Sequence, residues 1–262
     1  MRKRRLLLKK DIKDITDMEI IKKIAKKNAD IYAGGRVPTI AFFGDSVTHG
    51  CFEIYQTSET ALETEFDQRN AYHTILKNLL SDIFPKCPLN VLNAGISGDN
   101  ATNAYPRLER DVLSFKPDLV VVMFGLNDCS SGEQGLDSYV SNLKKIVNDC
   151  LSSGAEVILM TPNDMASSVD PHIEYYQGDF VKKAVKNCVE ARNKGYLDNY
   201  VNAMRKVAAE LNVPLCDVYA KWQALEKAGA NACEMLANRI NHPARAMNAL
   251  FAYSLLDTLI KD

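Results

Sequence analysis

Short apolar runs alternate with helical stretches along most of this chain. Five runs have the length and the apolar or β-branched content of buried strands, at residues 39–43, 90–92, 119–123, 156–161 and 214–217. Helices are expected between and after them, at about 70–84, 103–114, 137–152, 198–211 and 243–260. Strands that are apolar on both faces and separated by helices are typical of βαβ units around a parallel sheet. The chain is therefore expected to form one doubly wound α/β domain.

Composition narrows the class of protein without naming an activity. The 262 residues are 47% hydrophobic and 25% charged, the balance of a globular protein, and the net charge of −1 favours neither nucleic acid nor a membrane surface as a partner. No run approaches the roughly 20 apolar residues of a membrane span. Seven scattered cysteines without a Cys-x-x-Cys pair predict reduced thiols, no metal site and a cytoplasmic location.

The amino terminus differs from the rest of the chain. Six basic residues lie within its first ten positions, and we interpret them as a solvated helix start or arm, with a nucleic-acid or targeting role as the alternative. Helical spacing follows at 17–33, where Ile20, Ile21 and Ile24 share a face and Gly34-Gly35 ends the helix. Residues 1–36 are thus expected to be a basic, helical extension packed on a domain of residues 37–262.

Ser46 directly follows the first predicted strand, in the tetrapeptide Gly44-Asp45-Ser46-Val47. Functional groups of parallel sheets collect at the carboxyl ends of strands, so this hydroxyl is placed to meet a ligand. A serine needs a base and an oxyanion site before it acts as a nucleophile. Asp and Ser are also common helix caps, and the tetrapeptide alone leaves both interpretations open.

Three later turns offer partners for Ser46. Gly98 follows the second strand, and its N–H can approach a ligand oxygen because no side chain blocks the way. Asn127 follows the third strand and can donate from its side-chain amide, and His242 opens the last helix with a titration range suited to a general base. Each has an alternative as a turn or cap residue. Together they supply a nucleophile, a base and oxyanion donors.

These four segments resemble, in order, the sequence blocks of the SGNH, or GDSL, superfamily of serine esterases and lipases. The matching residues are Gly44-Asp45-Ser46, Asn93-x-Gly95-x-Ser97-Gly98, Gly125-Leu126-Asn127-Asp128 and His242-Pro243. The resemblance covers roughly residues 37–260, the hydrolase domain. It implies a three-layer α/β/α sandwich with a central, mainly parallel five-stranded sheet, as in flavodoxin. It also implies Ser46 as nucleophile, His242 as base, and an oxyanion hole of the Ser46 and Gly98 N–H groups with the Asn127 amide.

One position departs from the family pattern. The family usually has an aspartate three residues before the histidine, where this chain has Arg239. Asn238 is the candidate to orient the imidazole through its side-chain carbonyl, and a main-chain carbonyl, Glu234 or a water are the alternatives. A neutral orienting group lends no charge to the imidazolium, so a slower enzyme is expected.

Two connections are longer than a compact domain requires, at residues 50–69 and 162–197. Connections of this length are binding loops, lids or plain surface excursions. The substrate-binding candidates are Asp45 beside the nucleophile and three residues of the second connection, His172, Tyr175 and Tyr176. His172 is also an alternative base, and Trp222 is an alternative aromatic wall or core residue.

The predicted protein is a serine hydrolase that cleaves carboxylic esters through an acyl-enzyme and needs no cofactor or metal. By resemblance, its substrate is a small-molecule acetyl or other small-acyl ester of a carbohydrate or metabolite. Two alternatives stay open: an acyltransferase on the same scaffold, and a ligand-binding protein on a decayed scaffold, which the missing aspartate suggests. The oligomeric state is left open.

Overall fold

A computed structural model of the chain describes residues 18–32, 35–59, 61–171, 173 and 178–260. Its centre is a five-stranded sheet in the order β4-β1-β5-β6-β7, and every neighbouring pair is parallel. The strands are β1 (Thr39–Gly44), β4 (Asn90–Gly95), β5 (Leu119–Met123), β6 (Glu156–Met160) and β7 (Leu215–Cys216). All residues of β1 and β5 are buried, which explains why their sequences are nearly unbroken apolar runs.

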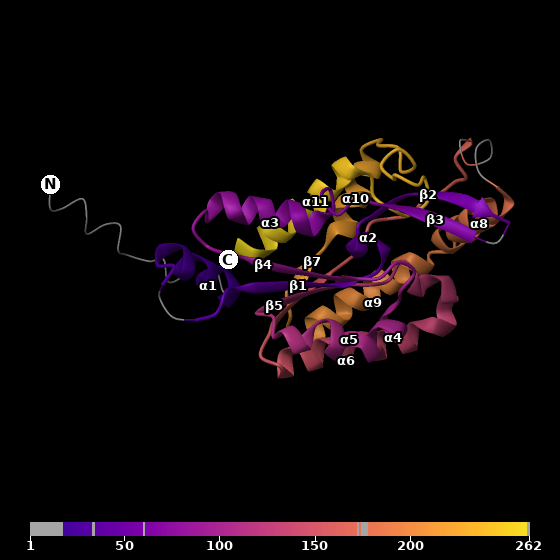
Figure 1. Cartoon of the computed structure of the whole chain (residues 1–262). Coiled ribbons are helices and arrows are strands. Elements are labelled where there is room, and N and C mark those ends of the chain that lie inside the picture. The colour runs from indigo at the N-terminus through magenta and orange to yellow at the C-terminus, as the bar shows by residue number, and fades with distance from the viewer. Residues whose placement is uncertain (1–17, 33–34, 60, 172, 174–177, 261–262) are drawn as a thin grey trace.

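Helices cover both faces of the sheet (Figure 1). One face carries α3 (Tyr72–Ile83), α10 (Val218–Lys227) and α11 (Arg245–Ile260). The other carries α4 (Ala101–Ala104), α5 (Leu108–Asp111), α6 (Leu136–Ser152) and α9 (Tyr196–Glu210). The predicted three-layer α/β/α sandwich is confirmed.

Packing of the helices follows their apolar stripes. In α3, Tyr72, Leu76 and Leu80 recur every four residues and are buried against the sheet layer. Trp222 of α10 is also fully buried in the main core, so it is a core residue and not part of a substrate wall.

The helix expected at about 103–114 is broken into short pieces. Between α4 and α5 lies the 3₁₀ turn η1 (Tyr105–Arg107), and η2 (Leu113–Phe115) follows α5. Pro106 lies within η1 and has no N–H to donate to the preceding turn, which accounts for the interruption.

The connection at 50–69 is a hairpin instead of an irregular loop. Strands β2 (Cys51–Ser58) and β3 (Ala61–Phe66) pair antiparallel and extend past the carboxyl ends of the parallel strands, beside α8 (Asp179–Asn193) (Figure 1). Gln56 of β2 accepts the N–H of Phe180, with 3.2 Å between Oε1 and N. The hairpin and α8 therefore meet beyond the sheet edge that carries the functional turns.

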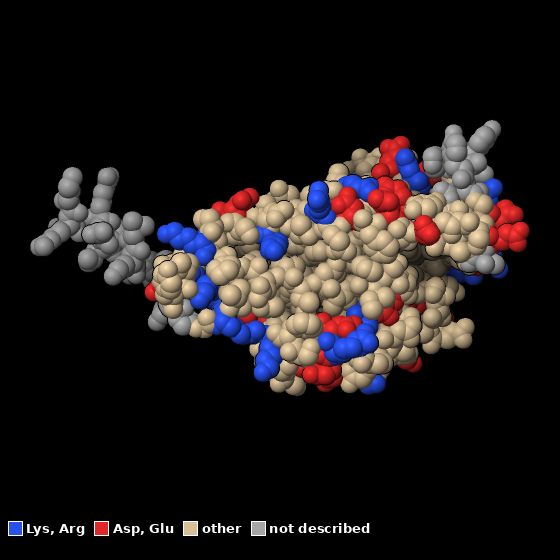
Figure 2. Space-filling model, viewed as in Figure 1, with Lys and Arg blue, Asp and Glu red and all other residues tan. Residues whose placement is uncertain are grey.

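Helix α1 (Glu19–Ala29) lies at the opposite end of the sheet (Figure 1). It buries Ile20, Ile21 and Ile24, and the Glu156 carboxylate accepts the N–H groups of Glu19 and Ile20 at 2.8 and 2.7 Å. Basic side chains gather around this helix (Figure 2), and Lys23 pairs with Asp118 at 2.9 Å. The basic residues 1–10 lie outside the described part of the chain. Within the described ranges, no helix combines the length and the apolarity that a membrane span requires.

Candidate active site

Ser46 and His242 meet although 196 positions separate them. Ser46 opens the short helix α2 (Ser46–His49) directly behind β1, and Asp45 caps that helix by accepting the Val47 N–H at 3.0 Å. His242 Nε2 lies 3.0 Å from Ser46 Oγ. Both side chains are almost completely buried, so the contact is shielded from bulk water.

The other imidazole nitrogen faces the backbone of the hairpin. His242 Nδ1 lies 2.9 Å from the carbonyl oxygen of Phe52, near the start of β2. A carbonyl only accepts, so Nδ1 carries the proton and Nε2 is left as an acceptor for the Ser46 hydroxyl. This is the tautomer that a general base needs. Burial lowers the pKa of His242 to about 4, against the opposing effects of the Phe52 carbonyl and the Glu53 charge.

Asn238 has a different task from the one expected of it. Its Oδ1 accepts the backbone N–H groups of Ile240, Asn241 and His242 at 3.0, 2.9 and 2.9 Å. The side chain therefore shapes the turn that presents the histidine, and the orienting group is the alternative, a main-chain carbonyl. A backbone carbonyl on a hairpin strand leaves no signature in the sequence.

The candidate oxyanion donors lie in turns that follow the two strands flanking β1, at the same edge of the sheet. Gly44 pairs with both Gly95 and Met123, so the turns after β1, β4 and β5 begin side by side. Gly98 has a φ of +80°, and no atom lies within 4 Å of the place where a Cβ would stand. Asn127 Nδ2 donates to the Asp99 carbonyl at 2.8 Å, which uses one of its two amide hydrogens.

Arg107 is a residue of this region that sequence reasoning missed. Its guanidinium donates to Asp99 Oδ2 and to the Ala94 carbonyl, both at 2.7 Å, and to the Gly44 carbonyl at 3.2 Å. It thereby ties the end of β1 to the turn that carries Gly98. A buried arginine in a short helical stretch looks like an ordinary surface residue in the sequence, so no local signal reveals this role.

Two buried carboxyl groups support the turns. Asp128 accepts the N–H groups of Ala101 and Gly125, both at 2.9 Å, and so anchors the turn around Asn127. Burial raises the pKa of Asp128 to about 6 and that of Asp45 to about 7. Asp45 has no exposed surface, which differs from its expected role in binding substrate. The other three candidates, His172, Tyr175 and Tyr176, lie outside the described residues.

Gly95 lets the nucleophile helix approach the sheet. A Cβ on Gly95 would stand 2.2 Å from the backbone nitrogen of His49, the last residue of α2. No flexible side-chain end is available to move aside, so the second sequence block needs glycine here for packing as well as for its turn.

We expect Gly95→Ala to cost about 3 kcal/mol or more of unfolding free energy, because the backbone of α2 or β4 has to shift. The rate should fall by more than the loss of folded protein explains, since the shift displaces Ser46. Urea unfolding and initial rates measure the two effects. Gly154→Ala is the control: its φ of +87° costs a side chain about 1–2 kcal/mol, but nothing lies within 4 Å of the new Cβ. Equal losses in both variants would contradict the packing argument.

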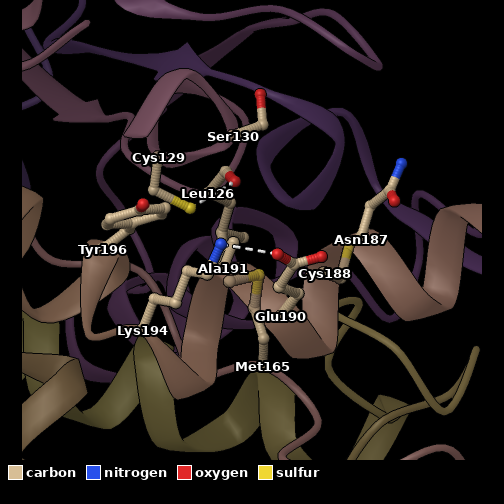
Figure 3. A pocket seen from close by; sticks show the side chains of 10 residues that line it. All are labelled: Leu126, Cys129, Ser130, Met165, Asn187, Cys188, Glu190, Ala191, Lys194 and Tyr196. Carbon is tan, nitrogen blue, oxygen red and sulfur yellow. Dashed lines mark hydrogen bonds and ion pairs between the residues drawn. The ribbon is translucent and has the colours of Figure 1, made fainter. Parts of the chain in front are cut away.

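A pocket of about 330 Å³ lies beside the Asn127 turn (Figure 3). It is bounded by residues on either side of Asn127, by Met165 after β6 and by α8, and the Glu190–Lys194 ion pair is part of its lining. Ser130 Oγ donates to the Asn127 carbonyl at 2.7 Å, which connects the pocket wall to the turn. The lining combines apolar with polar side chains; they are Leu126, Cys129, Ser130, Met165, Asn187, Cys188, Glu190, Ala191, Lys194 and Tyr196.

A serine paired with an imidazole at the carboxyl edge of a parallel sheet is the arrangement that serine hydrolases use. The chain belongs to the GDSL-like lipase/acylhydrolase family, whose model matches residues 42–250. It is a carboxylic ester hydrolase, as the family match and the esterases among its relatives show.

Two curated relatives and one solved structure illustrate the likeness. The acetylxylan esterase of Geobacillus stearothermophilus is 25% identical over 226 residues, which cover 83% of this chain and 91% of the relative. An uncharacterized lipoprotein of Bacillus subtilis (strain 168), YqeF, is 27% identical over 68% of this chain and 69% of its own length. The crystal structure of Axe2, an acetylxylan esterase from Geobacillus stearothermophilus, matches with a TM-score of 0.63 at 24% identity, over 87% of this chain and 96% of the other.

Proposed function

We propose that this protein releases acetate from acetylated carbohydrates with Ser46 as nucleophile and His242 as base. The observation that carries the proposal is the 3.0 Å contact between Ser46 Oγ and His242 Nε2, with Nδ1 held by the Phe52 carbonyl. These contacts give the imidazole the tautomer and direction that proton removal from a serine requires.

The chemical steps follow from this geometry. Ser46 Oγ attacks the acyl carbon while its proton passes to His242 Nε2, and the carbonyl π electrons move onto the acyl oxygen. The N–H groups of Ser46 and Gly98 and the free amide hydrogen of Asn127 are the proposed donors to that oxyanion. Collapse of the intermediate expels the alcohol, which takes the proton from His242. A water then attacks the acyl-enzyme by the same route and releases the acid.

The pocket beside Asn127 is our candidate for the alcohol part of the substrate. Its apolar residues suit the C–H face of a sugar ring, and the polar side chains of its lining suit the hydroxyls (Figure 3). Its volume of about 330 Å³ is at the small end of ligand pockets, which favours a single sugar unit over a long acyl chain. The relative named an acetylxylan esterase supports the same substrate class.

We expect the purified protein to release acetate from acetylated xylo-oligosaccharides and also to hydrolyse p-nitrophenyl acetate. Ala191→Leu fills the pocket and should raise KM for the acetylated sugar about 10-fold, which corresponds to roughly 1.4 kcal/mol of lost binding. The effect on p-nitrophenyl acetate should be smaller, because its flat nitrophenyl group takes up less of the pocket than a sugar unit does. Steady-state kinetics on both substrates measure the difference.

Ala184→Leu is the matched control, because it adds the same side chain to α8 at a residue that does not line the pocket. Turnover of p-nitrophenyl acetate without acetate release from any acetylated carbohydrate would refute the substrate assignment. Equal effects of Ala191→Leu on both substrates would refute the pocket assignment.

Two other points belong to the proposal. Acyl transfer would use the same acyl-enzyme and differ only in its acceptor, and the esterase relatives favour water as that acceptor. We also propose a reducing, cytoplasmic location. All seven cysteines lie in the described ranges and are unpaired, as is usual for proteins of reducing compartments. The relative named a lipoprotein is the contrary indication, and cell fractionation distinguishes the two locations.

A further inference from the structure

We propose that Glu53, Arg245 and Asp67 form a positioning cluster that does the work of the missing aspartate from the hairpin. The cluster would hold the Phe52 carbonyl against His242 Nδ1 and supply a net negative charge near the imidazole. This inference rests on the proposed function of Ser46 and His242.

Arg245 connects the two sides of the Nδ1 contact. It is the first residue of α11, three positions after His242, and its guanidinium forks onto the carboxylate of Glu53, the residue next to Phe52. The two distances are 2.6 Å from Nη1 to Oε1 and 3.0 Å from Nη2 to Oε2. Bidentate pairs of this kind fix orientation as well as distance. The histidine turn and the strand that supplies the carbonyl are thereby joined by a second, parallel link.

Further contacts make the link more rigid. Arg245 Nε donates to Asp67 Oδ2 at 2.9 Å, just after β3, and the guanidinium lies over the Phe52 ring with 4.4 Å from Cζ to the ring centre. The Asp67 N–H donates to the Gly50 carbonyl at 2.9 Å, where α2 ends. Both strands of the hairpin are therefore fixed at their base, next to the turn that carries Ser46.

The net charge of the cluster is negative, which stabilises a positively charged imidazolium. Two carboxylates and one guanidinium sum to −1. The hydrogen bond from Arg245 lowers the pKa of Glu53, and hydrogen bonds from Asn70 and then Arg245 lower the pKa of Asp67. Both groups therefore stay ionised at neutral pH. A proton transferred from Ser46 creates a buried cation on His242, and the Glu53 charge favours that cation.

Other charged or titratable groups lie on the elements around His242. His49 Nδ1 accepts the Ser97 N–H at 3.2 Å, and Asp45 caps α2. Arg239, in the histidine turn, pairs with Asp170 at 3.6 Å. Among the described residues, none of these neighbouring groups acts on the pKa of His242 through its charge, whereas Glu53 does.

A purely structural ion pair is the competing explanation. Arg245 and Glu53 are 37% and 45% exposed, and exposed pairs contribute little to stability. Removing such a pair would change the melting temperature or leave both stability and kinetics as they are. A positioning role predicts instead a lower kcat at unchanged KM, together with a displaced pH profile.

The test compares Glu53→Gln, Arg245→Met and the control Glu63→Gln, which neutralises a carboxylate of the same hairpin that pairs with Tyr55. We measure kcat, KM and melting temperature with p-nitrophenyl acetate from pH 3 to 9, so that an acid limb near pH 4 and its displacement both fall within the range. Glu53→Gln should lower kcat at least about 10-fold. It should also move the acid limb of the pH profile, the fall in kcat at low pH, to lower pH, because a charge that favours the imidazolium is lost. Arg245→Met should lower kcat and move the limb to higher pH, because the net charge becomes −2.

Rates and an acid limb in Glu53→Gln that match the Glu63→Gln control would overturn the inference. So would a lower kcat without any displaced limb, which indicates structural damage alone. If Arg245→Met fails to fold, Asp67→Asn takes its place and should shift the limb in the same direction as Glu53→Gln. An inactive wild type, or full activity in Ser46→Ala, would contradict the proposed function itself, so the two failures are distinguishable.

Discussion

Ser46→Ala is expected to lower kcat for p-nitrophenyl acetate by about 10⁴-fold or more while the fold stays intact. Without the hydroxyl no acyl-enzyme forms, and the imidazole has no proton to remove. The Ser46 side chain contacts His242 and adds little to the core, so the melting temperature should change by only a few degrees. Initial rates and thermal unfolding measure the two quantities.

The matched control is Ser114→Ala, an exposed serine of η2 whose hydroxyl donates to the Arg110 carbonyl of α5. It should retain full activity. A fluorophosphonate probe should label the wild type and the control but not Ser46→Ala. Labelling at another residue, or a rate in Ser46→Ala close to the wild type, would show that the nucleophile has been assigned wrongly.

The second large effect concerns His242. His242→Ala should lower kcat about as far as Ser46→Ala, because a serine without its base is a poor nucleophile and the two residues act as one unit. Adding imidazole to the assay should restore part of the rate if the space left by the ring admits it. Loss of rate in proportion to loss of folded protein would instead indicate a structural role.

The wild-type pH profile tests the same residue. Protonation of His242 stops general-base catalysis, and burial lowers the pKa of this group from 6.5 to about 4. The kcat/KM for p-nitrophenyl acetate should therefore stay level as the pH falls from 8 to about 5, and decline only around pH 4. An acid limb centred near pH 6.5 would mean that the imidazole is solvated in the free enzyme, contrary to its burial in the structure.

The central strands β1 and β5 could be predicted from the sequence because all their residues are buried, which gives nearly unbroken apolar runs. The edge strands β4 and β7 are only partly buried, and shorter, mixed stretches identified them. All five predicted strands end within a few residues of those in the structure.

The hairpin was not predicted although Leu62, Thr64 and Phe66 alternate with glutamates in its second strand, a period-2 pattern that is typical of a strand. The alternation spans only six residues, and the segment was treated as a long connection. The interruption of the helix expected at about 103–114 was not predicted, because the helical spacing of apolar residues was continued through Pro106.

The candidate site was predictable where side chains carry the chemistry. Ser46 and His242 belong to recognisable blocks, and parallel topology brings such blocks to one edge. The Phe52 carbonyl and the Arg107 anchor were not predictable, because a backbone oxygen has no residue type and a buried arginine looks like a surface one. Asn238 was assigned by its distance from His242 along the chain, which cannot show whether its oxygen faces a ring or a backbone.

The Phe52 carbonyl has a consequence for how such enzymes diversify. In a triad with an aspartate three residues before the histidine, the base and its orienting group lie on one loop. Here the orienting group lies on the β2–β3 hairpin, so a graft that replaced Cys51–Phe66 with the corresponding segment of a relative would also remove the carbonyl that contacts the proposed base. Swapping this segment to change specificity therefore requires that the donor segment return a carbonyl to the same point.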